Sequence, residues 1–167
     1  AGSSSGSTDA TGTSASFKNP EGITTDGTNL YVADFGNHRI RKIVISTGVV
    51  TTLAGSSQGS TNGTGTSAAF DEPYGITTDG TNLYVAESGD HNIRKIVIDN
   101  GTVTTLAGTG SQGYLDHITG TSAGFYRPQA ITTDGTNLYV ADYSNHRIRK
   151  IVIDNGTVTT LAGSSSG

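Results

Sequence analysis

Basic side chains gather in one short stretch that occurs three times in the sequence. The stretch reads HRIRK at residues 38–42 and 146–150, and HNIRK at residues 91–95. These stretches hold eight of the ten Lys and Arg residues, so they could form a basic ring that contacts RNA phosphates. They could equally serve structure, because Asp34 and Arg39 flank one hairpin, as do Asp142 and Arg147.

We expect the structural role for these Asp and Arg residues. In the middle copy Asn92 stands in place of Arg39 and Glu87 in place of Asp34, so the two positions change together. The 167 residues carry a formal charge of −4, with 14 acidic side chains and few aromatic residues between the basic ones. The sequence therefore predicts pairing within the fold and no nucleic-acid partner, with RNA binding as an alternative.

Histidines at three equivalent positions, His38, His91 and His146, could suggest a metal site. Stacked sheets lie about 10 Å apart, whereas the ligands of one zinc ion lie within roughly 4 Å of each other. Equivalent side chains on neighbouring sheets cannot therefore converge on one ion. We expect solvated or turn-packed histidines and no metal or other cofactor.

An enzyme would need different polar side chains gathered at one end of the molecule. Residues of this kind lie where the first strand of each unit begins, and they differ between the copies: Glu21, Asp71, Glu72, Tyr74, Arg127 and Gln129. No spacing among them resembles a ligand set, and the linkers have few carboxylates for calcium. We expect a protein that is not an enzyme, with a metal-dependent enzyme as the competing class.

One turn position varies more in character than the others, since it holds Phe35, Ser88 and Tyr143 in the three copies. Variable loop residues on a rigid scaffold often determine binding specificity. These three residues are the candidate ligand-binding positions. A protein, peptide or glycan would be the ligand class, although drift among copied units would produce the same variation.

These residues belong to a repeat that occupies most of the chain. Residues 22–55, 75–108 and 130–163 agree at 27 or 28 of 34 positions in every pairwise comparison. The full repeats run over about 11–55, 64–108 and 119–163, within a single domain of residues 1–167. A period of this size that is filled with strand patterns indicates a propeller or another repeat architecture.

Each repeat divides into four strand candidates. In the first copy these are GITTD, NLYVAD, RIRKIVI and VVTTLAG, and an Asp-Gly pair separates the first two. Such pairs favour tight antiparallel hairpins, so each unit is predicted to be a four-stranded meander. Apolar residues occur at both parities in LYVA and IRKIVI, so we expect each sheet to be covered on both faces.

The complete pattern resembles the NHL repeat, a propeller family. The resemblance covers all three units and rests on these residues of the first copy: Phe17, Pro20, Gly22, Asp26, Leu30, Tyr31, Val32, Ala33, Asp34, Asn37, His38, Arg39, Ile40 and Lys42. The second copy departs from it at Glu87, Asp90 and Asn92, and the third at Ala130 and Ser144. The resemblance implies four-stranded blades around a central channel, usually six of them.

Three blades would form an open wedge with two uncovered apolar faces, whereas propellers have about 4–8 blades. We therefore predict an all-β half-propeller that closes to six blades as a homodimer. Residues 1–14 match residues 54–67 at 11 positions, and residues 162–167 duplicate residues 1–6. Such ends, with Ala1 in first place, suggest a designed half-propeller or a fragment of a longer tandem array.

The composition of the chain limits which partners and compartments can be predicted. No run of about 18 apolar residues exists for a membrane span, so no membrane partner is expected. The sequence contains no Cys, which leaves the compartment undetermined. The predicted function is that of a non-enzymatic scaffold whose clearest activity is self-association.

Overall fold

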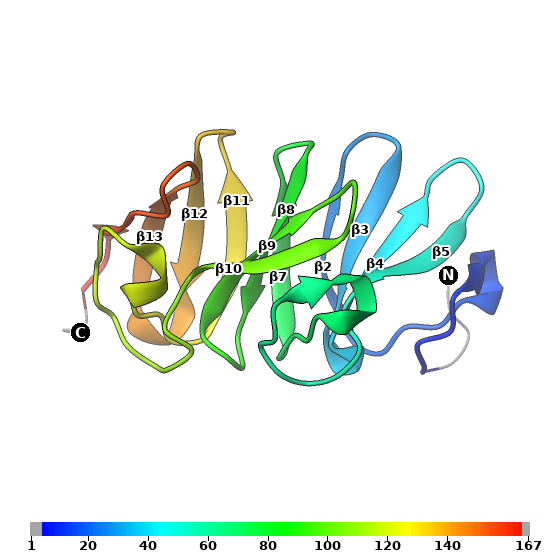
Figure 1. Cartoon of the computed structure of the whole chain (residues 1–167), viewed down its shortest axis with the longest axis horizontal. Helices are drawn as coiled ribbons and strands as arrows, with labels where there is room; N and C mark the ends of the chain where they lie inside the picture. The colour runs from blue at the N-terminus through cyan, green and yellow to red at the C-terminus, as the bar shows by residue number, and fades with distance from the viewer. Residues whose placement is uncertain (1–4, 165–167) are drawn as a thin grey trace.

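A computed structural model describes residues 5–164, and its strands form three antiparallel sheets that lie side by side along the chain (Figure 1). Each sheet falls within one of the three sequence repeats. Part of the duplicated chain ends, residues 1–4 and 165–167, lies outside the described residues. The innermost strands of the three sheets are neighbours, as expected for blades around an axis.

The first sheet has the strand order β1-β5-β4-β3-β2. Its strands are β1 (Ala10–Thr11), β2 (Pro20–Thr25), β3 (Asn29–Asp34), β4 (Arg39–Val44) and β5 (Val49–Ala54). We call β2–β5 blade 1. Two three-residue 3₁₀ turns accompany it, η1 (Gly12–Ser14) before the blade and η2 (Phe35–Asn37) between β3 and β4.

The second and third sheets repeat this plan. Blade 2 consists of β7 (Pro73–Thr78), β8 (Asn82–Glu87), β9 (Asn92–Val97) and β10 (Thr102–Ala107), with β6 (Gly63–Thr64) along its outer edge. Blade 3 consists of β11 (Pro128–Thr133), β12 (Asn137–Asp142), β13 (Arg147–Val152) and β14 (Val158–Ala162). The remaining 3₁₀ turns are η3 (Gly65–Ser67), η4 (Gly120–Ser122) and η5 (Tyr143–Asn145).

The linkers add a fifth strand that the four-strand prediction lacked. The chain that precedes blade 1 pairs Ala10 and Thr11 with β5, and the linker before blade 2 pairs in the same way with β10. The longer third linker makes only the isolated bridge between His117 and Val158. Each blade is therefore fixed at its outer edge by the segment that precedes it in sequence.

The first hairpin of each blade has the predicted turn. Asp26 Oδ1 accepts the backbone N–H groups of Thr28 and Asn29 at 2.8 and 2.7 Å, and Gly27 has φ +89°. Asp79-Gly80 and Asp134-Gly135 repeat these contacts. The aspartate side chain satisfies the turn amides, while glycine adopts positive φ without a steric penalty.

Two apolar cores lie between the blades, so the prediction that a sheet is covered on both faces is confirmed for blade 2. The first core joins Tyr31, Ala33, Ile40 and Ala54 of blade 1 to Phe70, Ile76, Leu83, Val85 and Ile96 of blade 2. The second joins Tyr84, Ala86, Ile93 and Ala107 to Phe125, Leu138, Val140 and Ile151. We call the Tyr-Ala-Ile-Ala side of a blade its leading face and the opposite side its trailing face.

Candidate functional site

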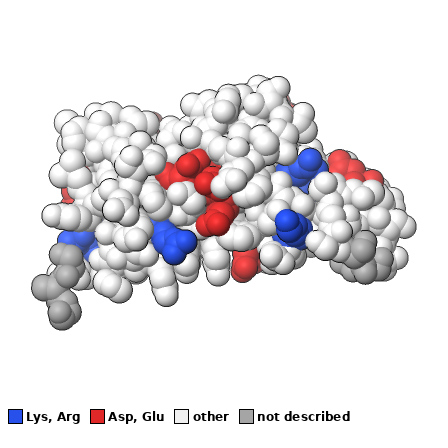
Figure 2. Space-filling view, turned by 90° about the horizontal axis from the view of Figure 1, so that it is seen from below, with Lys and Arg blue, Asp and Glu red and all other residues white. Residues whose placement is uncertain are grey.

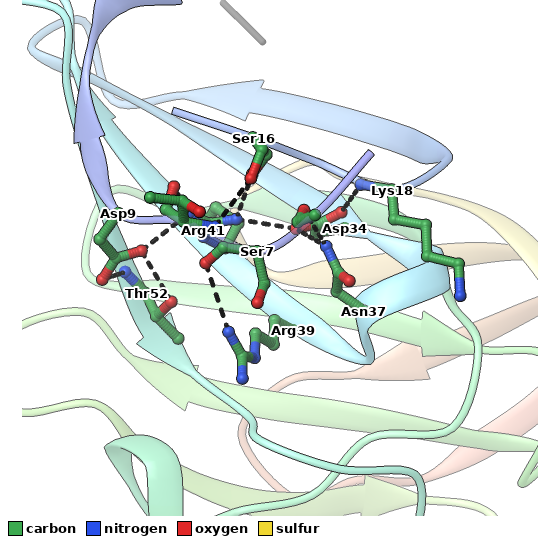
Figure 3. A network of polar contacts seen from close by, with 11 residues as sticks. Ser7, Asp9, Ser16, Lys18, Asp34, Asn37, Arg39, Arg41 and Thr52 are labelled. Carbon is green, nitrogen blue, oxygen red and sulfur yellow. Dashed lines mark hydrogen bonds and ion pairs between the residues drawn. The ribbon is translucent and has the colours of Figure 1, made fainter. Parts of the chain in front are cut away.

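Arg41 is the centre of the polar network inside blade 1 (Figure 3). Its side chain is fully buried, with Nη1 2.9 Å from Asp34 Oδ2 and 2.9 Å from the carbonyl oxygen of Ser16. Nη2 donates to Asp9 Oδ1 at 2.7 Å and to the carbonyl oxygen of Thr8 at 3.1 Å. The arginine thereby joins the blade to the segment that precedes it.

The other blades repeat the network with one variation. Arg149 contacts Asp142 at 2.8 Å and Asp116 at 2.7 Å, whereas Arg94 contacts Glu87 at 3.0 Å and the neutral Asn62 at 3.0 Å. Each arginine also lies over the ring of a phenylalanine, with 5.0, 5.3 and 4.9 Å from Cζ to the centroids for Phe17, Phe70 and Phe125. The position of the phenylalanine is thus set in the same way in all three blades.

The structure corrects the arginine that was assigned to each pair. Asp34 and Arg39 are register partners on β3 and β4, as are Asp142 and Arg147 on β12 and β13. The ion pairs nevertheless run from Asp34 to Arg41 and from Asp142 to Arg149, two residues further along the strand. Residues two apart in a strand share a face, so both arginines point to the same side as the aspartate, but only Arg41 and Arg149 are fully buried there.

The three arginines at the centres of these networks are too deeply buried to bind RNA. Arg41, Arg94 and Arg149 have no exposed surface, so they cannot contact phosphates. Figure 2 shows one face of the molecule, on which scattered Lys and Arg side chains flank a central acidic patch. This face has no continuous basic surface.

The three candidate ligand positions lie in equivalent turns after the second strand of each blade, but in different surroundings. The Phe35 ring packs edge-on against Tyr74 of blade 2 at 6.0 Å. Ser88 is buried, and its Oγ donates to Glu72 Oε2 at 3.2 Å. Tyr143 is 62% exposed. The structure therefore places Phe35 and Ser88 in internal contacts and presents Tyr143 to solvent.

Two of the three repeated histidines, His38 and His91, lie at contacts between blades, whereas His146 is exposed on blade 3. His38 adopts φ +55°, and its Nδ1 is 3.4 Å from the backbone N of Glu72, which donates to it. His91 Nδ1 accepts from the backbone N–H of Arg127 at 3.3 Å. In residues 5–164 no group of three or more His, Cys, Asp or Glu side chains is placed to hold a metal ion.

The residues proposed for an enzyme site are distributed over these same contacts. Tyr74 packs on Phe35, Glu72 accepts from Ser88, and Asp71 Oδ1 accepts from Gln58 Nε2 at 3.0 Å. The backbone of Arg127 donates to His91. The structure thus places these four at contacts within a blade, between blades and with a linker.

The trailing face of blade 1 is uncovered. Ile23 is 60% exposed, whereas its counterpart Ile76 in blade 2 is 6% exposed beneath blade 1. A pocket of about 280 Å³ opens on this face and is lined by Phe17, Pro20, Glu21, Gly22, Ile23, Val32 and Ile43. This face would meet a preceding blade if one were present.

The leading face of blade 3 is uncovered in the same way. Ile148 is 41% exposed, whereas Ile40 and Ile93 are fully buried at the two in-chain junctions. Pockets of about 230 and 280 Å³ open on this face, and both are lined by Ala141 and Ile148. The two exposed faces are thus copies of the two halves of an in-chain junction, located on the first and last blades (Figure 1).

The NHL repeat family model matches residues 17–43 and 125–151, which span the Phe-to-β4 and Phe-to-β13 parts of the first and third repeats. The chain carries NHL repeats. The second repeat is outside the matched ranges, and it is the copy with Glu87, Asp90 and Asn92. The NHL prediction from sequence is confirmed.

Known proteins support this assignment. The NHL chain is 31% identical over 163 residues to NHL repeat-containing protein 2 of Bos taurus, covering 88% of the chain and 22% of that protein. It therefore spans about a fifth of the length of this relative. An auxiliary nutrient binding protein from Bacteroides ovatus superposes with a TM-score of 0.69 at 25% identity, covering 90% of the chain and 39% of that structure.

A chain of a nidogen/laminin complex superposes with a TM-score of 0.62 at 20% identity. The match covers 87% of the NHL chain and 47% of that structure. The three NHL blades therefore match a part of larger six-bladed propellers. All helices among residues 5–164 are 3₁₀ turns of three residues, so none has the length of a membrane span.

Sequence reasoning missed the arginine that organises each blade, although the signal was present. Arg41, Arg94 and Arg149 are identical in the three copies, whereas the position of Arg39 changes to Asn92. Each of these arginines directly follows an isoleucine in a predicted strand, and a buried arginine needs a charged partner on the same sheet face. The invariant arginine was therefore the better candidate for the pair.

Proposed function

We propose that this chain is a non-enzymatic scaffold that closes into a six-bladed ring by pairing with a second copy of itself. One observation carries the proposal: the uncovered face of blade 1 and the uncovered face of blade 3 are copies of the two surfaces that pack together twice within the chain. A second copy placed head to tail would repeat that junction at both ends.

Packing across the junctions supplies the driving force. Each in-chain junction buries a phenylalanine, several branched aliphatic side chains and three alanines. Apolar surface removed from water contributes about 25 cal/mol per Å², and a standard interface buries about 800 Å² per partner. The cost of association reduces this gross term. Two equivalent junctions formed together leave no open face, which is the condition for closed symmetry.

The ring would carry two of the variable turn residues, Phe35 and Tyr143, on a rigid support. Tyr143 is exposed at the closing junction, and Phe35 is partly exposed in the equivalent turn of blade 1. An aromatic side chain in such a turn suits contacts with a protein, peptide or glycan. The proposed ligand class follows from this surface and not from any relative.

Sedimentation velocity and native mass spectrometry over a wide range of protein concentrations test the proposal. The expected species has twice the 17.1 kDa mass of the chain. Small-angle scattering of that species would give the dimensions of a closed ring. A chain that remains a monomer at every concentration, or a dimer with an elongated open shape, would overturn the proposal.

A further inference from the structure

Each in-chain junction contains one phenylalanine from the later blade. Phe70 is fully buried in the first core, with Ala54 and Ile40 of blade 1. It lies so close to Gly55 that a Cβ built there would come within 2.8 Å of its ring. Phe125 occupies the same position in the second core with Ile93 and Ala107. The junctions thus share a phenylalanine pocket formed by the leading face of the earlier blade.

The leading face of blade 3 presents the same pocket without a phenylalanine. The pocket of about 230 Å³ is lined by Ala141, Ile148, Ala162 and Gly163, together with Asp142, Tyr143, His146 and Arg147. The first four residues correspond to Ala33, Ile40, Ala54 and Gly55, which contribute to the Phe70 site. We call these four residues, with His146, the blade 3 pocket.

The matching phenylalanine lies at the other end of the chain. Phe17 is the counterpart of Phe70 and Phe125, and it lines the pocket on the uncovered face of blade 1. Its ring lies against the Arg41 guanidinium at 5.0 Å, as the other two lie against Arg94 and Arg149. Phe17 therefore makes the same contact with its arginine as the two junction phenylalanines do, and this contact reduces the ordering cost of insertion.

One substitution changes the closing junction where the innermost strands meet. Gly22 and Gly75 lie where the innermost strands of neighbouring blades approach each other. A Cβ at Gly22 would come within 3.0 Å of the Tyr74 carbonyl oxygen, and a Cβ at Gly75 would do the same with that of Gln129. The third copy of this glycine is Ala130, whose side chain is exposed on blade 3.

By the same geometry, the Ala130 methyl would meet the Glu21 carbonyl oxygen of a second copy. Overlap of this kind is relieved only by a shift of the strands, which weakens packing. The closing junction must therefore stand wider near the axis than the two junctions within the chain. The outer part, where Phe17 would enter the blade 3 pocket, is unaffected by this residue.

We propose that Phe17 of one chain inserts into the blade 3 pocket of another as the anchor of the closing junction, and that Ala130 weakens this junction so that the dimer is reversible. The inference rests on the proposed function, because it specifies how the two chains meet. It names the second copy as the occupant, since the chain itself shows twice which residues fill this pocket.

The test measures the dimer dissociation constant by sedimentation equilibrium. Phe17→Ala is expected to weaken the dimer at least about 100-fold, because buried aromatic anchors dominate interface affinity and each dimer contains two of them. Ile148→Asp changes the opposite surface and is expected to give the same loss. Ile118→Ala is the matched control, since Ile118 is 78% exposed outside both faces, and the dissociation constant should stay unchanged.

Ala130→Gly is expected to tighten the dimer about tenfold, because it removes an overlap with backbone atoms at the closing junction. Urea unfolding of each variant separates loss of assembly from loss of folding. A wild-type chain without any dimer overturns both this inference and the proposed function. A dimer that Phe17→Ala leaves intact overturns only the anchor, and an Ala130→Gly dimer no tighter than wild type overturns the role of Ala130.

Discussion

Arg41 and Asp34 form an ion pair in which both side chains are completely shielded from solvent, with 2.9 Å between Nη1 and Oδ2. The other oxygen of Asp34 accepts the backbone N–H of Lys18 at 2.8 Å, and Asn37 Nδ2 donates to Oδ2 at 2.8 Å. The pair therefore fixes both the hairpin turn and the segment that carries Phe17. A buried charge in such a site is stable only with its partner, because no water is available to solvate the charge if the partner is removed.

Removal of the Arg41 charge is expected to destabilise the chain strongly. Arg41→Ala leaves Asp34 buried without its counter-ion, which costs about 3–5 kcal/mol. Arg39→Ala is the matched control, because the Arg39 side chain is only partly buried and its hydrogen bond to the Ser7 carbonyl is long, at 3.5 Å. We expect this control to cost about 1 kcal/mol or less. Equal losses in urea unfolding would show that the two arginines share the structural role.

The contrast between Arg39 and Arg41 shows which features could be predicted from the sequence and which could not. The repeat, the hairpin turns and the two-sided burial of a blade followed from periodicity and turn residues, because these are local properties. The choice between Arg39 and Arg41 depended on which guanidinium lies under the linker, and that linker contact joins Arg41 to Asp9 across 32 positions. The pattern within one repeat carries no information on such a contact, and the available signal was the comparison of the three copies, in which only the Arg41 position is arginine throughout.

The side chains on the uncovered faces are a second feature that the sequence did not predict. The sequence predicted that three blades leave two open sides, but not which side chains form them. That assignment needed the register of β3 and β4, which places Ala33 opposite Ile40. It also needed the close approach at Gly22, because that contact explains why an alanine at position 130 matters at the closing junction.

The turn aspartates are expected to make stability depend on pH in acid. Burial raises the pKa of Asp79, but hydrogen bonds from Asn82, Tyr84 and Thr81 outweigh it and hold that pKa below 3.8. Between the folded pKa and 3.8 the unfolded chain binds more protons, so the free energy of unfolding rises with pH through this window. The contribution is complete above pH 3.8 and is lost as pH falls through the folded pKa.

Asp79→Asn tests this contribution. The difference in unfolding free energy between wild type and Asp79→Asn should be larger at pH 6 than near pH 2, as measured by urea titration with circular dichroism. A difference that stays constant across this range would exclude the carboxylate as its source. Thr105→Ser serves as a control, since it changes a neutral side chain at the outer edge of blade 2.

Tyr31 donates its hydroxyl to the turn aspartate of blade 1 and should therefore ionise at a higher pH than an ordinary tyrosine. Burial, followed by the hydrogen bond to Asp26 and its charge, raises the pKa of Tyr31 to about 12. Its hydroxyl lies 2.8 Å from Asp26 Oδ2. Ultraviolet absorbance titration should therefore show tyrosine ionisation well above pH 10 that shifts downward in Asp26→Asn. An unchanged titration in that variant would contradict the assigned contact.

Single-stranded RNA is expected to bind weakly or not at all. The three invariant arginines are buried, and the remaining basic side chains are dispersed around acidic ones on the face in Figure 2. Fluorescence anisotropy with labelled polyuridine at 50 and 200 mM salt measures this directly, because phosphate contacts give a steep salt dependence. Tight binding that falls steeply with salt would contradict the expectation.

The close approach of β7 and β11 makes Gly75 sensitive to the smallest side chain. A Cβ there would lie within 3.0 Å of the Gln129 carbonyl oxygen and 3.2 Å from Ala130 Cα. The contacting atoms are backbone, so they cannot rotate away, and Gly75→Ala should cost about 1–3 kcal/mol in urea unfolding. Gly22→Ala should behave alike, because its Cβ would meet the Tyr74 carbonyl.

Ala130→Gly is the reverse substitution at the third copy. Among residues 5–164 no blade packs on the Ala130 methyl, so removing that methyl relieves no overlap within one chain. Glycine in a strand instead lowers the stability of the chain by roughly 0.5–1 kcal/mol. The same variant should tighten the dimer, so folding and assembly respond in opposite directions. If Gly75→Ala costs no more than Ala130→Gly, then the innermost strands can separate freely, and the Ala130 methyl cannot weaken the closing junction.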